Sequence, residues 1–306
     1  MFLGTPEVAA GTLRALTEAG HDVALVVTTP DRRRSRRAEP SPTPVKRVAA
    51  ELGIRVTEDV GDVVGAGASL GVVVAFGRII AADVLVQVPM VNLHFSLLPR
   101  WRGAAPVERA ILAGDPTTGV CVMAVEKDLD TGPVYARREV GIGEDETAGE
   151  LRRRLGALGT ALLVELLGRE SGLPEPVPQS GEPTYAAKLT PDELRLDFNR
   201  SAVECARLVR AGRAWTTFRG RRLIIVAARA VAGGAAAAGP PGVLEGSAVV
   251  TGAGLLELVG VQSEGRGPLP FGAWRTGARP CAGEVLGGVP APARRPTAHG
   301  GPRAGR

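Results

Sequence analysis

Short apolar runs alternate with amphipathic segments along the first half of the chain. MFLGTP reads as the end of a strand, three runs are apolar enough for strands buried on both faces of a sheet, residues 22–29, 71–77 and 91–95, and residues 54–57 are strand-like. Helical patterns follow the first two of these strands, over residues 7–19 and 43–53, and Thr5-Pro6 and Thr43-Pro44 suit their N-caps and first positions. Strands that alternate with helices imply right-handed crossovers, so we predict an α/β, Rossmann-like parallel sheet.

The second half has a different pattern. GVCVMAVE and VYARREV read as two strands that flank the loop KDLDTGP, and leucines spaced by three or four predict a helix over 147–170. The stretch ESGLPEPVPQSGEPT is rich in Pro, Gly and Ser, which is typical of a linker. After it come one helix, SAVECARLVRAG, and several short strands with glycine turns, which favour a small OB-like β-barrel.

These patterns predict four regions along the chain. We expect an N-terminal α/β domain, a linker, a C-terminal β domain and a disordered basic tail, at residues 1–175, 176–196, 197–287 and 288–306. The tail is too poor in apolar residues to pack.

Composition and charge narrow the class of protein only slightly. The net charge is +5, but the stretch Arg275–Arg306 holds six arginines against Glu284 and accounts for that excess. Cys121, Cys205 and Cys281 are far apart and lack nearby histidines, so neither a disulfide framework nor a zinc site is expected. No apolar run approaches the roughly 20 residues of a membrane span, and no signal-peptide pattern is present at the N-terminus. We expect a cytoplasmic monomer without a membrane partner.

Asn92 and His94 stand out because they interrupt an apolar strand. Residues two apart on a strand project to the same side, and ligands of open α/β sheets bind beyond the carboxyl ends of the strands. An amide and an imidazole suit chemistry at a carbonyl, where both can donate to a developing oxyanion. A hydrogen-bonded core histidine and a polar cap at the strand end would account for the same residues, so the spacing leaves both interpretations open.

The loop KDLDTGP adds a third candidate. A carboxylate from Asp128 or Asp130 could orient a histidine or accept its proton. Taken alone, an Asp-x-Asp loop is more often turn chemistry, because aspartate caps its own backbone. Sequence does not show whether either carboxylate lies near His94.

A basic loop follows the second predicted strand. Five arginines fall within six positions, Arg32, Arg33, Arg34, Arg36 and Arg37. They could contact several phosphates of a nucleic acid, and further arginines at the start of the second domain make RNA a reasonable partner. A solvated loop in an arginine-rich chain is the competing interpretation. The chain has no nucleophile elbow, Walker loop or Gly-x-Gly-x-x-Gly fingerprint, which disfavours covalent serine catalysis and nucleotide hydrolysis.

Several longer stretches, taken in order, resemble the methionyl-tRNA formyltransferase family. They include FLGTPEVAAGTLRAL, TTPDR, VVVAFGRII, NLHFSLLPRWRGAAPVERAILAGD, LDTGPV, WTTFRG and LLELVGVQSEGRGPLP. The resemblance implies transfer of a formyl group from 10-formyltetrahydrofolate to the α-amino group of methionine on initiator tRNA, in translation initiation. It also implies that the reaction needs neither a metal ion nor a covalent enzyme intermediate.

The resemblance carries roles to individual residues. Asn92, His94 and Asp130 match the family's catalytic residues, and Ser96, Leu97, Leu98 and Pro99 match its folate-contacting segment. Arg32–Arg37 occupy the loop that enters the tRNA acceptor arm in the family, and the C-terminal domain would hold the tRNA.

Two other functions stay open from sequence. One is a folate-dependent N-formyltransferase that acts on a small amine, such as an amino-sugar nucleotide. The other is a catalytically impaired RNA-binding relative, because the first strand is about half the usual 5 to 6 residues and segments near 60–69, 87–90 and 209–218 are shorter than in the family.

Overall fold

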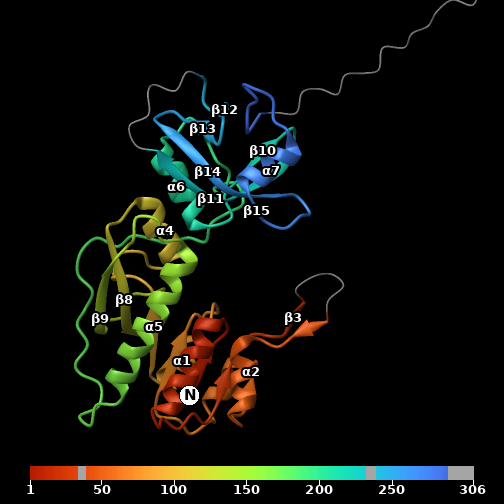
Figure 1. Ribbon diagram of the computed structural model, residues 1–306. Helices are drawn as coiled ribbons and strands as arrows, with labels where there is room; N and C mark the ends of the chain where they lie inside the picture. Colours follow the sequence, from red (N-terminus) through yellow and green to blue (C-terminus); the bar gives the residue numbers. More distant parts are fainter. Residues whose placement is uncertain (34–38, 232–238, 289–306) are drawn as a thin grey trace, which may run out of the picture. The chain divides into compact units, whose positions relative to one another are not determined.

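The computed structural model describes residues 1–33, 39–231 and 239–288 and divides the chain into two compact units (Figure 1). Unit 1 comprises Met1–Thr190 with Arg210–Gly212, and unit 2 comprises Pro191–Val209 with the chain from Arg213 onward. Residues 176–190, which the sequence pattern assigns to a linker, therefore group with unit 1. Most of the predicted basic tail, residues 289–306, lies outside the described residues.

Unit 1 is built on a mixed seven-stranded sheet. Its order is β5 (Val56–Thr57), β2 (Val26–Val27), β1 (Phe2–Gly4), β6 (Gly71–Val74), β7 (Met90–His94), β8 (Thr117–Ala124) and β9 (Val134–Gly141). The first five strands run parallel, and β8 and β9 are antiparallel additions. The predicted parallel sheet is confirmed, and its central strand β1 is only three residues long.

Helices connect and cover these strands. They are α1 (Glu7–Glu18), α2 (Pro44–Glu51), α3 (Ala82–Gln87), α4 (Pro106–Ala113) and α5 (Ala148–Leu167), with a 3-10 turn at Val60–Val63 and a small hairpin of β3 (Arg32–Arg33) and β4 (Pro40–Ser41). Thr43 caps α2 as predicted, since its hydroxyl accepts from the Lys46 N–H at 3.1 Å. The predicted cap of α1 is wrong, because Pro6 occupies the N-cap and the Thr5 hydroxyl has no partner among the described residues.

Successive side chains of β7 point to opposite faces of the sheet, so its apolar and polar residues are separated. Val91 and Leu93 are buried in the core formed with α1 and α5, two helices that lie side by side in Figure 1. Asn92 and His94 therefore project from the opposite face of the sheet. The core brings α5 very close to β7, because a Cβ at Gly159 would lie 2.7 Å from Leu93 Cδ1.

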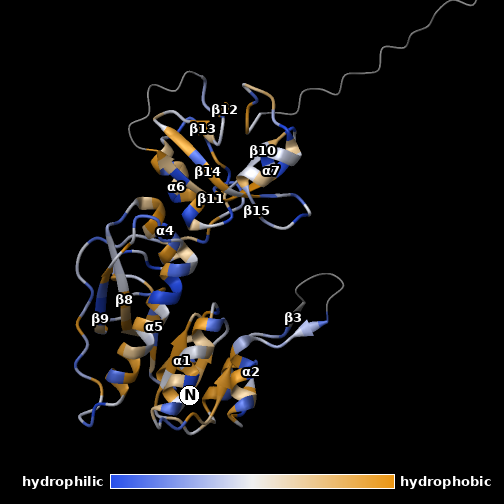
Figure 2. Cartoon of the chain, in the orientation of Figure 1, coloured by the Kyte–Doolittle hydropathy of each residue, from blue (hydrophilic) through white to orange (hydrophobic). Residues whose placement is uncertain are grey.

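Unit 2 contains a six-stranded antiparallel sheet and two helices. The strands are β10 (Trp215–Phe218), β11 (Arg221–Val231), β14 (Leu255–Ser263), β13 (Ala248–Val250) and β12 (Leu244–Glu245) in spatial order, with β15 (Leu269–Pro270) paired to β14. The helices are α6 (Ala202–Ala211) and α7 (Phe271–Ala278). Apolar residues along β14 (Figure 2) pack with Phe198, Ile225 and Trp274 in a core of the unit's own. Unit 2 is thus the small antiparallel β domain that the glycine-rich strand pattern predicts.

None of the helices in the described ranges is long and apolar enough to span a membrane.

Substitution of Gly159 tests the close contact between α5 and β7. Gly159→Val should destabilise the chain by about 1–3 kcal/mol, because the added atoms overlap the buried Leu93 side chain. Gly149→Ala in the same helix is the control, since a Cβ there is exposed, and we expect it to stabilise by up to about 1 kcal/mol. Urea unfolding followed by the helical circular dichroism signal measures both, and an unfolding free energy for Gly159→Val at or above that of the parent chain would contradict the packing.

Candidate active site

Asn92 and His94 lie at the carboxyl end of β7. In the register of the sheet Asn92 stands between Val73 of β6 and Met123 of β8, and His94 stands beside Cys121 of β8. The Asn92 side chain is half-buried, whereas His94 is buried. Both side chains thus emerge at the edge of the sheet where α/β folds bind their ligands.

Asp130 reaches this pair from the loop between β8 and β9. Its Oδ1 accepts from Asn92 Nδ2 at 3.4 Å, and its Oδ2 lies 3.5 Å from His94 Nδ1. The stronger contact of Oδ2 is with the Gly103 main-chain N–H, at 2.8 Å. The structure therefore brings together the three residues that sequence suggested separately, over contacts long enough to shorten when a substrate binds.

The second aspartate of that loop does not take part. Asp128 is exposed, and its main-chain oxygen accepts from the Thr131 hydroxyl at 3.2 Å, which is ordinary turn chemistry.

Hydrogen-bond acceptors face both nitrogens of the His94 ring. Nε2 lies 2.9 Å from the Trp101 main-chain oxygen, and Nδ1 faces the Asp130 carboxylate. A neutral imidazole has one N–H, so only the doubly protonated ring can donate to both oxygens at once.

The segment Ser96–Pro99 turns the chain away from β7. The buried Ser96 hydroxyl donates to the Arg100 main-chain oxygen at 2.6 Å, and Leu98 packs against Cys121 and Met123. Leu97 and Pro99 are half-buried, and the Leu98–Pro99 peptide bond is cis. Ser96 and Leu98 shape the turn, which leaves Leu97, Pro99 and the main chain as its accessible parts.

Trp101, just after this turn, is held in an unusual conformation. Its φ is +63°, which is rare for a large side chain. Asp115 accepts from the Trp101 indole N–H at 2.7 Å and pairs with Arg100, whose guanidinium lies 4.5 Å from the indole centroid. These contacts fix the main-chain oxygen that faces His94.

Residues 177–187, which we call the strap, return to the site after α5. Val177 exchanges two main-chain hydrogen bonds with Val134, and Thr184 and Ala186 bond to the main chain of Arg102. Between these anchors, Gln179 Nε2 donates to the main-chain oxygens of Asp130 and Gly132, each at 2.8 Å. The sequence does not predict this contribution, because a Pro-, Gly- and Ser-rich stretch gives no signal for where a single glutamine will bind.

Gly103 shows how closely the strap approaches. Its φ is +116°, and a Cβ there would lie 3.0 Å from the Ala186 main-chain oxygen. The glycine therefore permits its N–H to reach Asp130 while its other side faces the strap.

Unpartnered groups border the site at neighbouring strand ends. The Thr5 and Thr29 hydroxyl oxygens, which follow β1 and β2, are buried and lack a hydrogen-bond partner among the described residues. Ile79, which follows β6, is 89% exposed. The two hydroxyl oxygens are covered by protein, so Ile79 is the accessible side chain among these three.

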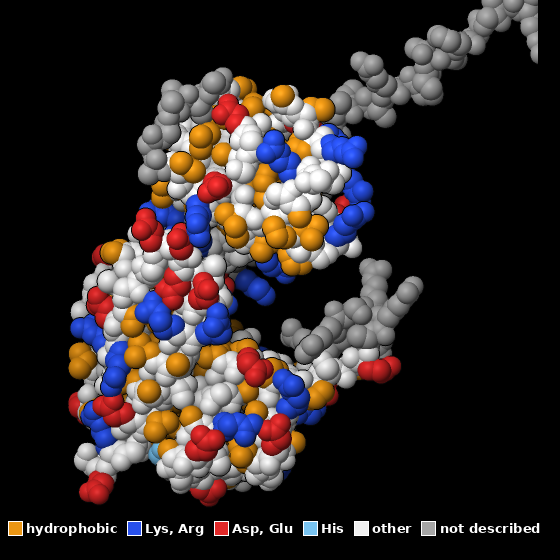
Figure 3. All heavy atoms as spheres, viewed as in Figure 1, with side chains coloured by type: hydrophobic (Ala, Val, Ile, Leu, Met, Phe, Trp, Pro, Cys, Tyr) orange, Lys and Arg blue, Asp and Glu red, His pale blue; other side chains and the backbone are white. Residues whose placement is uncertain are grey.

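The arginines of the predicted RNA-binding surfaces have different roles. Arg32 and Arg33 form β3, whereas Arg34, Arg36 and Arg37 lie outside the described residues. In unit 2, Figure 3 shows basic side chains over the region where Figure 1 draws α7 and β10.

The arginines of unit 2 differ in whether their charge is used within the unit. Arg219 is bound to Glu284 and to the main-chain oxygens at the end of α7, so its charge is used within the unit. Arg222 and Arg195 are exposed and lie 4.4 Å and 5.6 Å from the Trp215 ring centroid. The indole N–H of Trp215 donates to the Pro191 main-chain oxygen at 2.8 Å, which holds the ring in place. We call the Trp215 ring with Arg195 and Arg222 the Trp215 platform.

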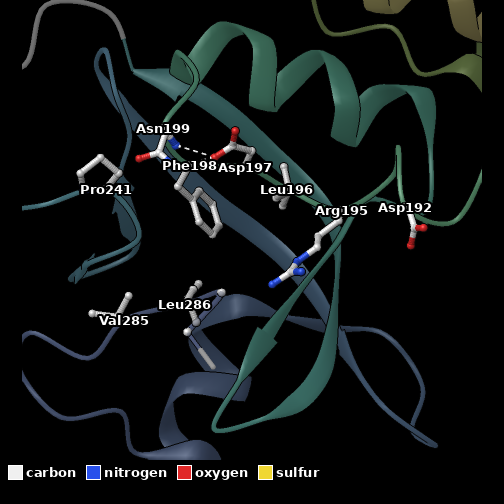
Figure 4. A pocket seen from close by; sticks show the side chains of 11 residues that line it. Asp192, Arg195, Leu196, Asp197, Phe198, Asn199, Pro241, Val285 and Leu286 are labelled. Atoms are coloured by element: carbon white, nitrogen blue, oxygen red, sulfur yellow. Dashed lines mark hydrogen bonds between the residues drawn. The ribbon is translucent and has the colours of Figure 1, made fainter. Parts of the chain in front are cut away.

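Unit 2 also contains an open cavity of about 520 Å³ (Figure 4). Arg195 and Phe198 line it together with Asp197 and Asn199, which are hydrogen-bonded to each other at 2.8 Å. Asn92, His94 and Asp130 are not among its lining residues.

Nothing in the described ranges assembles three or more His, Cys, Asp or Glu side chains for a metal ion. Cys121 lies beside His94, but burial raises the pKa of its thiol to about 11. The thiol therefore stays protonated near neutral pH and is a poor nucleophile.

Comparisons with known proteins assign the chain to a family. The Formyl transferase family model matches residues 1–167, and the Formyl transferase C-terminal domain model matches residues 188–279. The methionyl-tRNA formyltransferase of Dinoroseobacter shibae is 43% identical over 96% of this chain and 98% of its own length.

Among solved structures, the fold is similar to two proteins of low sequence identity. One is the N-formyltransferase of Helicobacter canadensis in complex with folinic acid and dTDP-3-aminofucose, with a TM-score of 0.64, 16% identity and coverage of 84% of this chain and 97% of that chain. The other is HypX of Aquifex aeolicus in complex with tetrahydrofolic acid, with a TM-score of 0.62, 18% identity and coverage of 90% of this chain and 46% of that chain.

Thiol labelling tests the protonation and burial of Cys121. At pH 8 the folded chain should react rapidly at the exposed Cys281 and resist at Cys121 and Cys205, since burial raises the pKa of both thiols to about 11. Cys281→Ser protein should resist labelling until it is unfolded. Mass spectrometry of the labelled peptides identifies the sites, and rapid modification of Cys121 in folded protein would contradict the arrangement.

Proposed function

Because the chain belongs to the methionyl-tRNA formyltransferase family, its activity is formyl transfer to methionyl-tRNA, and we propose that Asn92, His94 and Asp130 carry out this reaction. The observation that carries the proposal is the convergence of these three side chains at the carboxyl end of β7. The formyl donor is a folate in this family, and we propose 10-formyltetrahydrofolate for this chain.

The chemistry follows from the charges that develop during the reaction. As the methionine amine adds to the formyl carbon, the formyl oxygen gains negative charge. The Asn92 amide is one donor available to that oxygen, and the His94 ring supplies a second once its Nε2 N–H turns from the Trp101 oxygen to the formyl oxygen. One such donor contributes about 3 to 4 kcal/mol to transition-state stabilisation. Asp130 stabilises the protonated ring and fixes its orientation, since Asp130 Oδ2 faces His94 Nδ1.

The same residues account for proton movement. The attacking amine must lose a proton, and the departing folate nitrogen must gain one. His94 is buried between two acceptors and can relay that proton, so the transfer requires neither a metal ion nor an acyl-enzyme.

A folate fits the accessible groups around the site. The donor supplies a formyl group on a flat, polar heterocycle with a charged tail. We propose that the segment Ser96–Pro99 binds it through Leu97, Pro99 and the main chain, while Ile79 offers an apolar surface for the ring. Folinic acid and tetrahydrofolic acid in the two structurally similar proteins support this choice of ligand.

We further propose that the tRNA contacts the basic loop Arg32–Arg37 and the surface of unit 2. In unit 2 the Trp215 platform combines an aromatic face with the guanidinium groups of Arg195 and Arg222. Such a combination suits the stacking and phosphate contacts by which RNA is bound.

Substitutions of the donors test the catalytic assignment. Asn92→Ala and His94→Ala should each lower kcat for formylation of methionyl-tRNA by about 10²–10³-fold, because each removes a donor that acts mainly in the transition state. Asp128→Asn is the matched loop control and should keep full turnover. Melting temperatures check that the variants fold, and normal kcat in both Asn92→Ala and His94→Ala would contradict the assignment.

Charge removal in the basic loop tests the tRNA contact. A triple variant with Arg33, Arg34 and Arg36 changed to Gln should raise KM for tRNA and make its dependence on salt less steep, by about 0.7–0.9 in the log–log slope per lost phosphate contact. KM for the folate should not change. The control replaces three exposed arginines elsewhere, Arg137, Arg153 and Arg169. An unchanged slope in the loop variant would favour a solvated loop.

A further inference from the structure

We propose that Gln179 is a positioning residue for formyl transfer, which acts by holding Asp130 in the orientation that directs its carboxylate at His94. This inference rests on the proposed catalytic role of Asp130. Gln179 lies in the strap, 49 residues beyond Asp130 in sequence.

The Gln179 amide joins the two loops that form the site. Its Nε2 donates to the main-chain oxygens of Asp130 and Gly132, and its Oε1 accepts from Arg102 Nε and Nη2 at 3.1 and 2.7 Å. Arg102 stands between Trp101, whose oxygen faces His94, and Gly103, whose N–H holds the Asp130 carboxylate. One side chain thus connects the main chain of the Asp130 loop to the Arg102 guanidinium of the segment on the other side of the catalytic group.

Both loops need such support because each contains a residue in the left-handed region. Asp130 has a φ of +54° and Trp101 a φ of +63°. Such conformations cost about 1–3 kcal/mol each and persist only where the surroundings fix them. The Asp130 main-chain oxygen is fixed by Gln179, and the Trp101 N–H donates to the Thr184 hydroxyl at 2.9 Å, so the strap secures both.

A glutamine is required by this geometry. Both N–H groups of the amide are used by carbonyl oxygens and its oxygen by a guanidinium. A glutamate would place oxygen against the oxygens of Asp130 and Gly132, and a methionine would fill the space without hydrogen bonds.

Gln179 is not needed to attach the strap to unit 1. The strap is anchored by main-chain hydrogen bonds between Val177 and Val134 at one end and between Arg102 and Thr184 or Ala186 at the other. Loss of the Gln179 side chain should therefore leave the fold in place while the Asp130 loop gains freedom to rotate.

The first measurement separates kcat from KM. Gln179→Met should lower kcat by about 10–100-fold, because displacements near 1 Å at a catalytic group have effects of this size. KM for methionyl-tRNA and for the folate should stay within about twofold, and the melting temperature should not fall. Gln87→Met, at an exposed glutamine that bonds only to its own helix, is the matched control. Gln179→Glu should be as slow as Gln179→Met, and normal turnover in either would overturn the proposal.

A double-mutant cycle then tests whether Gln179 acts through Asp130. Asp130→Asn keeps the main-chain oxygen and tolerates the positive φ, but it removes the carboxylate charge. In that background Gln179→Met should slow turnover by less than about threefold, whereas a purely structural role would reduce kcat by the same factor in both backgrounds.

The cycle also separates this inference from the proposed function. Full turnover in Asp130→Asn would remove the catalytic role of Asp130, and with it this inference. If Asp130→Asn is slow and Gln179→Met lowers kcat by the same factor in both backgrounds, the role of Gln179 alone is overturned.

Discussion

The Asp130 carboxylate bonds to the Gly103 main-chain N–H at 2.8 Å, and the rest of the site depends on that contact. It joins the loop after β8 to the segment after β7, and only then do Asn92 and His94 face a carboxylate. Gly103 permits the contact because it has no Cβ to meet the strap. The arrangement of the proposed catalytic residues is thus produced by three chain segments that are distant in sequence, on a sheet whose strands supply a rigid edge.

The fold of unit 1 was largely predictable because the sequence patterns that mark its strands and helices involve residues close together in the chain. Continuous apolar runs mark strands that are buried on both faces, and Thr43 with Pro44 marks the start of α2 by chemistry confined to one turn. The spacing along β7 also predicted that Asn92 and His94 project to the same side of the strand, but it left open whether they serve packing or chemistry. The short helices α3 and α4 were not predicted, and the six residues of α3 give too few turns for a period to emerge.

The site was predictable only in part, for a different physical reason. The residue types indicated chemistry at a carbonyl. The distance between His94 and Asp130, however, depends on how β7 pairs with β8 and where the loop after β8 lies, and neither is a local property of the sequence. Thr5 was expected to cap α1, yet Pro6 takes that place and leaves the hydroxyl unpartnered at the strand edge. The role of Gln179 could not be predicted from the sequence. The strap is held by main-chain hydrogen bonds, so its residues show no periodic pattern of apolar positions.

The strap also determines where the chain can be cut into fragments without loss of part of the site. By composition the natural place to cut the chain is the proline-rich stretch after α5, and a fragment ending at residue 175 would keep Asn92, His94 and Asp130. It would lose the residues that bond to Arg102 and to the Asp130 loop. The smallest piece that keeps every residue of the proposed site therefore extends through the strap, to residue 187. Exchange of C-terminal domains among such proteins would keep the proposed site intact only if the junction falls after the strap. Recombination at the compositional boundary would separate Asn92, His94 and Asp130 from part of their support.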